Sequence, residues 1–269
     1  MRSTACVRMK PSTHTITGID SPDQGDVDGF LPPYEPVQVL DPQNPISIGA
    51  MVGPEAFTEV RFLQHYKQNL ALRLLPEFAA EFKACFGRES GGLLRSYRAD
   101  DAELLVVAMG SVNGTIKDTI DEMRADGIRV GLVTLVSFRP FPTQALRDAL
   151  AGAKHVVVIE KSFAIGMGGQ LANNVDLALR NTPGAPRVHS VIAGLGGRPI
   201  TRPSLHSLLR RALVQPWEGA HFLDLNERIV SKELHYARKV RRSGPTAENL
   251  LRRLSESAPE PALEVRSVS

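Results

Sequence analysis

The chain has 269 residues, of which 42% are hydrophobic, and this is enough for one domain-sized core with residues left over for arms or tails. Because 32 Lys and Arg stand against 29 Asp and Glu, the formal net charge is only +3, and no nucleic-acid partner is expected. No run approaches the roughly 18 apolar residues that span a bilayer, and the start lacks the apolar region of a secretory signal. We therefore expect a cytoplasmic protein with no membrane partner.

The two cysteines, Cys6 and Cys85, lie far apart and outside any CxxC or histidine-rich setting. An iron–sulfur cluster or a four-cysteine zinc site needs about four thiolate ligands, so neither is expected from this chain alone. The seven histidines show no HxH or HxxxH grouping. The sequence therefore predicts no metal site.

Residues 1–45 are rich in proline and other turn formers, which predicts an extended arm that wraps over its own domain or reaches a partner. Residues 46–99 form a segment in which apolar side chains recur at helical spacing, beginning at Phe57. Pro76 is expected to separate two helices, since a proline inside a helix costs about 3 kcal/mol. Gly87 is expected to end the second of them.

Residues 100–216 alternate between strand and helix patterns, which predicts one α/β domain. Short apolar runs predict strands buried on both faces at 103–110, 128–138, 154–161 and 187–194. A helical pattern follows each of them, at 113–127, 143–153, 168–181 and 204–214. The four units predict a three-layer α/β/α sandwich with a mainly parallel, doubly wound sheet. Residues 217–269 are expected to be a C-terminal extension that is partly disordered.

Two glycine-rich turns follow the third and fourth predicted strands. They contain Gly168 and Gly169 in "GMGG", and Gly196 and Gly197 in "GLGG". Glycine lets a backbone approach an anion, so these turns are candidates for cofactor binding. Neither turn matches the Walker loop or the dinucleotide fingerprint GxGxxG, and such glycines are more often used for tight turns and close helix packing. We favour the turns, and a nucleotide site stays open.

Two arginines also follow predicted strands, Arg139 in "SFRPFP" and Arg198 in "GLGGRPIT". Either could bind a carboxylate or phosphate of a ligand, because ligands bind beyond the carboxyl ends of such strands. The structural alternative, which we favour, is an ion pair of Arg139 with Glu160. Ser111 and Thr115 lack the GxSxG elbow of a hydrolase and are expected to cap the following helix. No residue is predicted to be catalytic.

These strand ends, together with "LPPYEP", "LDPQNPISIGAMVGPEAFTEVRFLQ" and "EFAAEFKACFGRESGGLLRSYRADD", form an ordered set of phrases. From about residue 30 to 214 they resemble the α subunit of the pyruvate:ferredoxin (flavodoxin) oxidoreductase, or pyruvate synthase, family. The resemblance implies a transketolase C-terminal-like domain at 100–216. It also implies conversion of pyruvate and coenzyme A to acetyl-CoA and carbon dioxide, with electrons passed to ferredoxin or flavodoxin.

The family uses thiamine diphosphate, iron–sulfur clusters and coenzyme A, and its α subunit normally begins with a domain that binds the thiamine pyrimidine. Residues 1–29 do not resemble that domain. We therefore expect a subunit or fragment that binds none of these cofactors by itself, is inactive in isolation and joins thiamine-binding and cluster-binding chains. The alternatives are an inactive remnant that acts as an interaction module, and a weak nucleotide- or coenzyme A-binding α/β domain.

Overall fold

The computed structural model describes residues 21–45, 49, 51–215, 217–237 and 246–256. Its centre is a six-stranded sheet of order β1-β3-β2-β4-β7-β8. The strands are β1 (Leu94–Tyr97), β2 (Leu104–Ala108), β3 (Val130–Leu135), β4 (His155–Glu160), β7 (Arg187–Ile192) and β8 (Ala220–Phe222). All neighbouring pairs are parallel except β1 with β3. The predicted mainly parallel sheet is confirmed.

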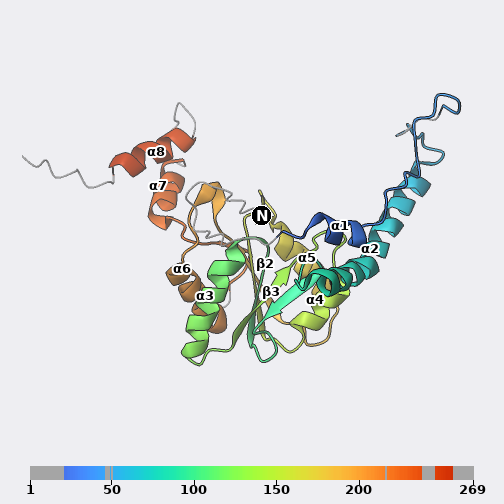
Figure 1. Cartoon of the computed structure of the whole chain (residues 1–269). Coiled ribbons are helices and arrows are strands. Elements are labelled where there is room, and N and C mark those ends of the chain that lie inside the picture. Colours follow the sequence, from blue (N-terminus) through green and yellow to red (C-terminus); the bar gives the residue numbers. More distant parts are fainter. Residues whose placement is uncertain (1–20, 46–48, 50, 216, 238–245, 257–269) are drawn as a thin grey trace, which may run out of the picture.

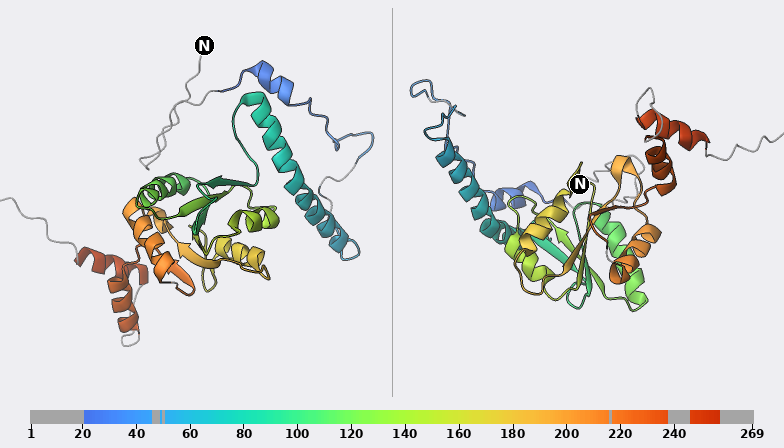
Figure 2. Two further views of the ribbon diagram at one scale, coloured as in Figure 1. Left: turned by 90° about the horizontal axis from the view of Figure 1, so that it is seen from below. Right: turned by 180° about the vertical axis from the view of Figure 1, so that it is seen from behind.

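Helices cover both faces of this sheet, so the predicted three-layer sandwich is also confirmed (Figures 1 and 2). They are α3 (Val112–Ala125) and α6 (Arg202–Val214) on one face, and α4 (Thr143–Leu150) and α5 (Gln170–Leu179) on the other. Alternate side chains of each central strand point to opposite faces: Val106 packs with the α3 and α6 side, and Val107 with the α4 and α5 side. Both are fully buried, which explains the continuously apolar strand sequences.

Two strands of the sheet come from outside residues 100–216. The edge strand β1 lies within the segment expected to be helical, and β8 lies within the expected C-terminal extension. The short helices α7 (Glu227–Ala237) and α8 (Thr246–Glu256) follow β8. The predicted disorder at the very end of the chain falls on residues outside the described part.

A long helix, α2 (Phe57–Phe86), projects from the sandwich (Figure 1). The prediction that Pro76 separates two helices is wrong, since the helix continues through it for 30 residues and ends at Gly87, which has φ 66°. Proline removes one backbone donor, and the hydrogen bonds on either side of it keep the helix continuous. The short helix α1 (Gln24–Phe30) lies against its C-terminal half, where Phe30 contacts Phe82 and Phe86 edge to face. The start of the predicted arm lies outside the described residues.

An aromatic cluster joins β4 and β7 to Trp217, which lies just before β8. The Nδ1 atom of His155 lies 3.3 Å from Nε2 of His189, and the His189 ring is 4.7 Å from that of Trp217. The indole N–H of Trp217 donates to the Ser190 carbonyl at 3.2 Å. Burial, with the nearby His155 and Arg187, lowers the pKa of His189 to about 4.

Acidification should therefore weaken the fold through His189. An unfolded histidine takes up a proton below about pH 6.5, whereas His189 in the folded protein stays neutral until about pH 4. Its contribution to the free energy of unfolding is complete above pH 6.5 and decreases by about 3 kcal/mol as the pH falls to 4. Urea unfolding at pH 7 and pH 4 should show this loss. In His189→Phe the acid-induced loss should be smaller than in the wild type by this amount, and equal losses in both proteins would contradict the assignment.

Candidate functional site at the strand ends

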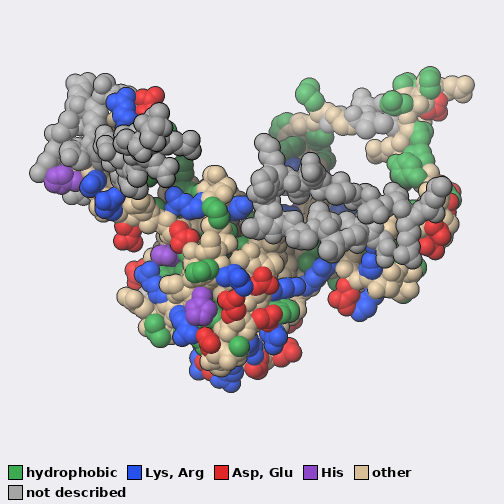
Figure 3. All heavy atoms as spheres, turned by 60° about the vertical axis from the view of Figure 1, so that its left-hand side comes forward, with side chains coloured by type: hydrophobic (Ala, Val, Ile, Leu, Met, Phe, Trp, Pro, Cys, Tyr) green, Lys and Arg blue, Asp and Glu red, His purple; other side chains and the backbone are tan. Residues whose placement is uncertain are grey.

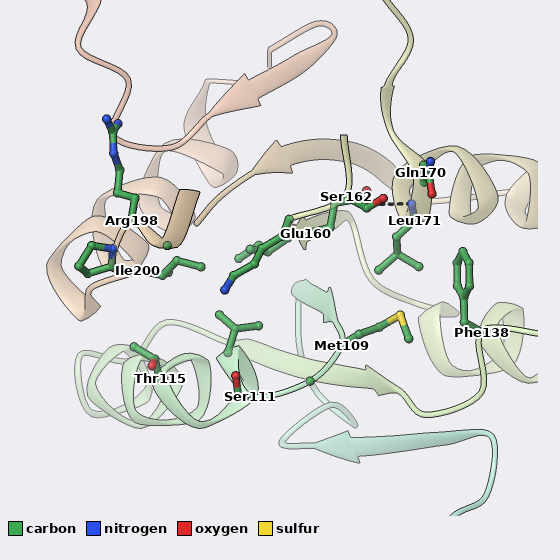
Figure 4. A pocket seen from close by; sticks show the side chains of 16 residues that line it. Met109, Ser111, Thr115, Phe138, Glu160, Ser162, Gln170, Leu171, Arg198 and Ile200 are labelled. Carbon is green, nitrogen blue, oxygen red and sulfur yellow. Dashed lines mark hydrogen bonds between the residues drawn. The ribbon is translucent and has the colours of Figure 1, made fainter. Parts of the chain in front are cut away.

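A cavity of about 570 Å³ lies at the carboxyl ends of β2, β4 and β7 (Figure 4). All four strand-end segments contribute to it, for example Met109, Phe138, Lys161 and Arg198. A parallel sheet brings these ends to one edge, as the sequence predicts. Apolar side chains form a large part of the described cavity wall: Met109, Val112, Phe138, Ile159, Leu171, Pro199 and Ile200.

Glu160 contributes the one carboxylate of the described cavity wall, and this carboxylate already has partners. Its oxygens accept hydrogen bonds from the backbone N–H groups of Leu171, at 2.8 Å, and Ala172, at 2.9 Å. These groups belong to the first turn of α5, where a negative charge is stabilised by the helix dipole. Glu160 therefore caps α5 from the end of β4 (Figure 4).

The glycine turn before α5 makes room for that cap. Gly168 and Gly169 form the short strand β6 (Gly168–Gly169), which pairs with β5 (Phe163–Ala164). A Cβ atom on Gly169 would lie 2.2 Å from Glu160 Oε1 and 3.0 Å from Ser190 Oγ. Neither glycine lines the cavity. The N–H groups of Leu171 and Ala172 are thus bound to Glu160 and are not open to a phosphate.

Arg139 does not form the expected ion pair with Glu160, and this expectation is wrong. Its guanidinium donates to the Phe138 carbonyl at 2.7 Å and to the Asn174 side chain at 3.1 Å. It also lies 4.2 Å from the centroid of the Phe138 ring, a cation–π contact. The Glu160 carboxylate instead binds the backbone N–H groups at the start of α5. Arg139 is exposed at a structural corner, outside the cavity wall.

The second glycine turn lies on the other side of the cavity. Gly196 and Gly197 belong to the short helix η1 (Leu195–Gly197), with φ 63° and 83°, so the conformation favours glycine at both positions. Gly197 and Arg198 line the cavity. The Arg198 guanidinium points away from its centre and donates to the Asp224 carbonyl (Figure 4). Gly197 and Arg198 are therefore the two candidates that the structure brings to the cavity.

Lys161 is a cavity residue that was not among the sequence candidates. It directly follows the last residue of β4, and its carbon chain passes over Gly194. In the described part of the chain, no ion pair or hydrogen bond engages its ammonium group. In the sequence, the position of this lysine directly after an apolar strand could have identified it as a candidate.

Ser111 and Thr115 line the cavity at the start of α3, but the expected cap is wrong in its detail. Ser111 occupies the N-cap position, yet its side chain makes no capping hydrogen bond. Its backbone is in the helical region at φ −70° and ψ −21°, whereas a capping side chain usually needs an extended residue.

Residues 102–205 match the family described as "Pyruvate:ferredoxin oxidoreductase core domain II". Residues 102–205 thus form a core domain II of the pyruvate:ferredoxin oxidoreductase family. The matched residues include the four central parallel strands and every described residue of the cavity wall. The resemblance found in the sequence is confirmed.

Curated relatives extend the similarity beyond this domain. The chain is 38% identical over 199 residues to "Pyruvate synthase subunit PorA" of Methanothermobacter thermautotrophicus, covering 74% of this chain and 51% of that protein. It is 33% identical over 190 residues to "Ketoisovalerate oxidoreductase subunit VorA" of Pyrococcus horikoshii, covering 70% of this chain and 48% of that protein. The chain thus spans about half the length of the curated relatives that it matches.

Solved structures show more distant similarity. One is described as "2-oxoglutarate:ferredoxin oxidoreductase from Magnetococcus marinus with 2-oxoglutarate, coenzyme A and succinyl-CoA bound". It has a TM-score of 0.38 and 19% identity, and the match covers 54% of this chain and 23% of that chain. Another, "Split gene transketolase, inactive beta4 tetramer", has a TM-score of 0.37 and 18% identity over 52% of this chain and 54% of that chain.

The described residues do not fit the redox cofactors of this family. Cys85 is the one cysteine among them and is exposed, whereas a cluster needs about four thiolates. No three His, Cys, Asp or Glu side chains among these residues are placed to hold a metal ion of the kind that binds a diphosphate. Within the same residues, no helix is both long and apolar enough to cross a membrane.

Proposed function

We propose that this chain is a subunit, or a part of one, of a 2-oxoacid:ferredoxin oxidoreductase of the pyruvate synthase type. The complex would convert pyruvate, coenzyme A and oxidised ferredoxin to acetyl-CoA, carbon dioxide and reduced ferredoxin. The 38% identity to a pyruvate synthase subunit over 199 residues carries this proposal. The partners are the thiamine-binding and cluster-binding chains, and ferredoxin or flavodoxin reaches this chain only through the complex.

The contribution of this chain is assembly. Around the cavity, Glu160 is engaged as a helix cap and Arg198 is bound to a backbone carbonyl, so neither is available for acid–base work. The isolated chain should accordingly be inactive. Its sheet is complete without a partner, since buried strands and helices fill both sides.

The surface that supports assembly is formed by the apolar residues exposed along α2, and we call it the α2 surface. Its exposed residues are Phe57, Phe62, Leu63, Tyr66, Leu74 and Phe78. The visible face of the α/β domain mixes basic and acidic side chains, while apolar side chains stand out on the projecting segment (Figure 3). Exposed apolar groups of this extent are typical of a surface that another chain covers.

Reconstitution tests the proposal. The chain is purified together with the products of its neighbouring genes, and reduction of a low-potential acceptor by pyruvate and coenzyme A is measured with and without it. We expect turnover in the complete mixture and at least a tenfold loss when the chain is left out. Unchanged turnover without the chain would disprove its membership in the enzyme.

A further inference from the structure

We propose that the cavity at the strand ends binds a small organic anion, a carboxylate or a phosphate on an apolar body, with the Lys161 ammonium as the partner of the anionic group. The proposal goes beyond the assembly role, since it assigns a ligand to this domain itself. It is independent of thiamine, clusters and ferredoxin.

The size and lining of the cavity suit such a ligand. Its volume of about 570 Å³ is in the usual range for small-molecule sites, which combine apolar walls with few polar groups. Met109, Phe138 and Ile200 supply apolar contacts (Figure 4). Ser111 and Ser162 lie on opposite sides and offer neutral hydroxyl donors. The ligand therefore needs an apolar body and a group that accepts hydrogen bonds.

The charges of the wall favour an anionic group, since two basic side chains and one acid line it. Glu160 is the single acid of the described wall, and two backbone N–H groups take up its carboxylate. Arg198 is turned toward Asp224. Lys161 remains as a cation for which the described residues supply no ion pair. A carboxylate or phosphate would complete this pair, because charge-assisted hydrogen bonds are the strong ones.

The backbone beneath Lys161 is shaped to hold this side chain. Gly194 is buried, with φ 75°, and a Cβ there would lie 2.7 Å from Lys161 Cε and 3.4 Å from its Cγ. The absent side chain therefore leaves the path along which the lysine stem runs. Lys161 is exposed, and its stem lies along the backbone at Gly194, which places the ammonium group at the rim of the cavity.

Calorimetric titration of the full chain tests the proposal with three probes: octanoate, adenosine monophosphate and inorganic phosphate. We expect octanoate or the nucleotide to bind with a dissociation constant below about 1 mM, and the better of the two identifies the anionic group. Inorganic phosphate should bind at least tenfold more weakly, because it lacks the apolar body. Equal binding of all three, or no binding of either organic probe at millimolar concentration, would overturn the proposal.

Three variants locate the site. Lys161→Met keeps roughly the length of the side chain and should raise the dissociation constant of the bound probe at least tenfold. Lys154→Met makes the same change at the opposite end of β4, where Lys154 pairs with Glu103, and should change binding less than twofold. Met109→Trp, which fills the apolar wall, should also weaken binding tenfold while leaving the charge in place. Binding that is equal in wild type and Lys161→Met, with the melting temperature unchanged, would refute the role of Lys161.

Discussion

Gly169→Ala should lower the free energy of unfolding by about 2–4 kcal/mol. The new methyl group would lie 2.2 Å from Glu160 Oε1 and 2.9 Å from Glu160 Cδ, at a position where Gly169 itself is buried. To avoid the overlap, Glu160 must move away from the start of α5. That movement breaks its hydrogen bonds to Leu171 and Ala172 and leaves two backbone donors without partners.

Chemical denaturation measures this loss, and Gly114→Ala is its matched control. Gly114 lies within α3, is exposed, and has no atom within 4 Å of its added Cβ. Alanine at this position should stabilise the protein by about 0.5–1 kcal/mol, since glycine weakens a helix interior. The same chemical change thus has opposite signs at the two sites. A Gly169→Ala protein as stable as the wild type would mean that Glu160 does not cap α5.

The central strands could be predicted from the sequence because each of them contains its own signal, a short run of apolar residues. Val106 and Val107 are buried on opposite faces, so both must be apolar, and this makes a continuous run rather than an alternation. The sequence did not predict the edge strand β1, because β1 lacks such an apolar run. It pairs with β3 alone and carries exposed Arg95 and Ser96, so its residues show no such run.

The contacts of the site were less predictable, because each charged side chain there has several groups nearby with which it could form a hydrogen bond. Arg139 and Glu160 both follow strands, and either could pair with the other. Only the fold shows that backbone N–H groups of α5 donate to Glu160. Arg139 donates instead to the Phe138 carbonyl and the Asn174 side chain. Lys161 stands beside Glu160 in sequence, but its position over Gly194 depends on packing between β4 and β7. Such pairings over long sequence separations cannot be read from periodicity.

The double variant Phe62→Asp/Tyr66→Asp should weaken assembly with the partner subunits at least a hundredfold, while the chain itself stays folded. The two rings are 63% and 52% exposed, and α2 contains no buried residue, so their removal takes nothing from the core. Residues four apart share one side of a helix, and the pair therefore lies at one place on the α2 surface. Aromatic anchors contribute about 2 kcal/mol or more each at protein interfaces, and carboxylates there would be buried without a partner.

Titration of the partner subunits with this chain, followed by light scattering or calorimetry, measures the effect. Gln68→Asp is the control, because it also adds a carboxylate to an exposed position of α2 without removing an apolar group. It should alter the dissociation constant less than about threefold. If the double variant assembles as tightly as Gln68→Asp, the α2 surface does not contact a partner, and assembly must use another face. If both lose assembly equally, added charge alone is responsible, and the apolar contact is excluded. Selective loss in the double variant would identify the α2 surface as the part of this chain that holds the complex together.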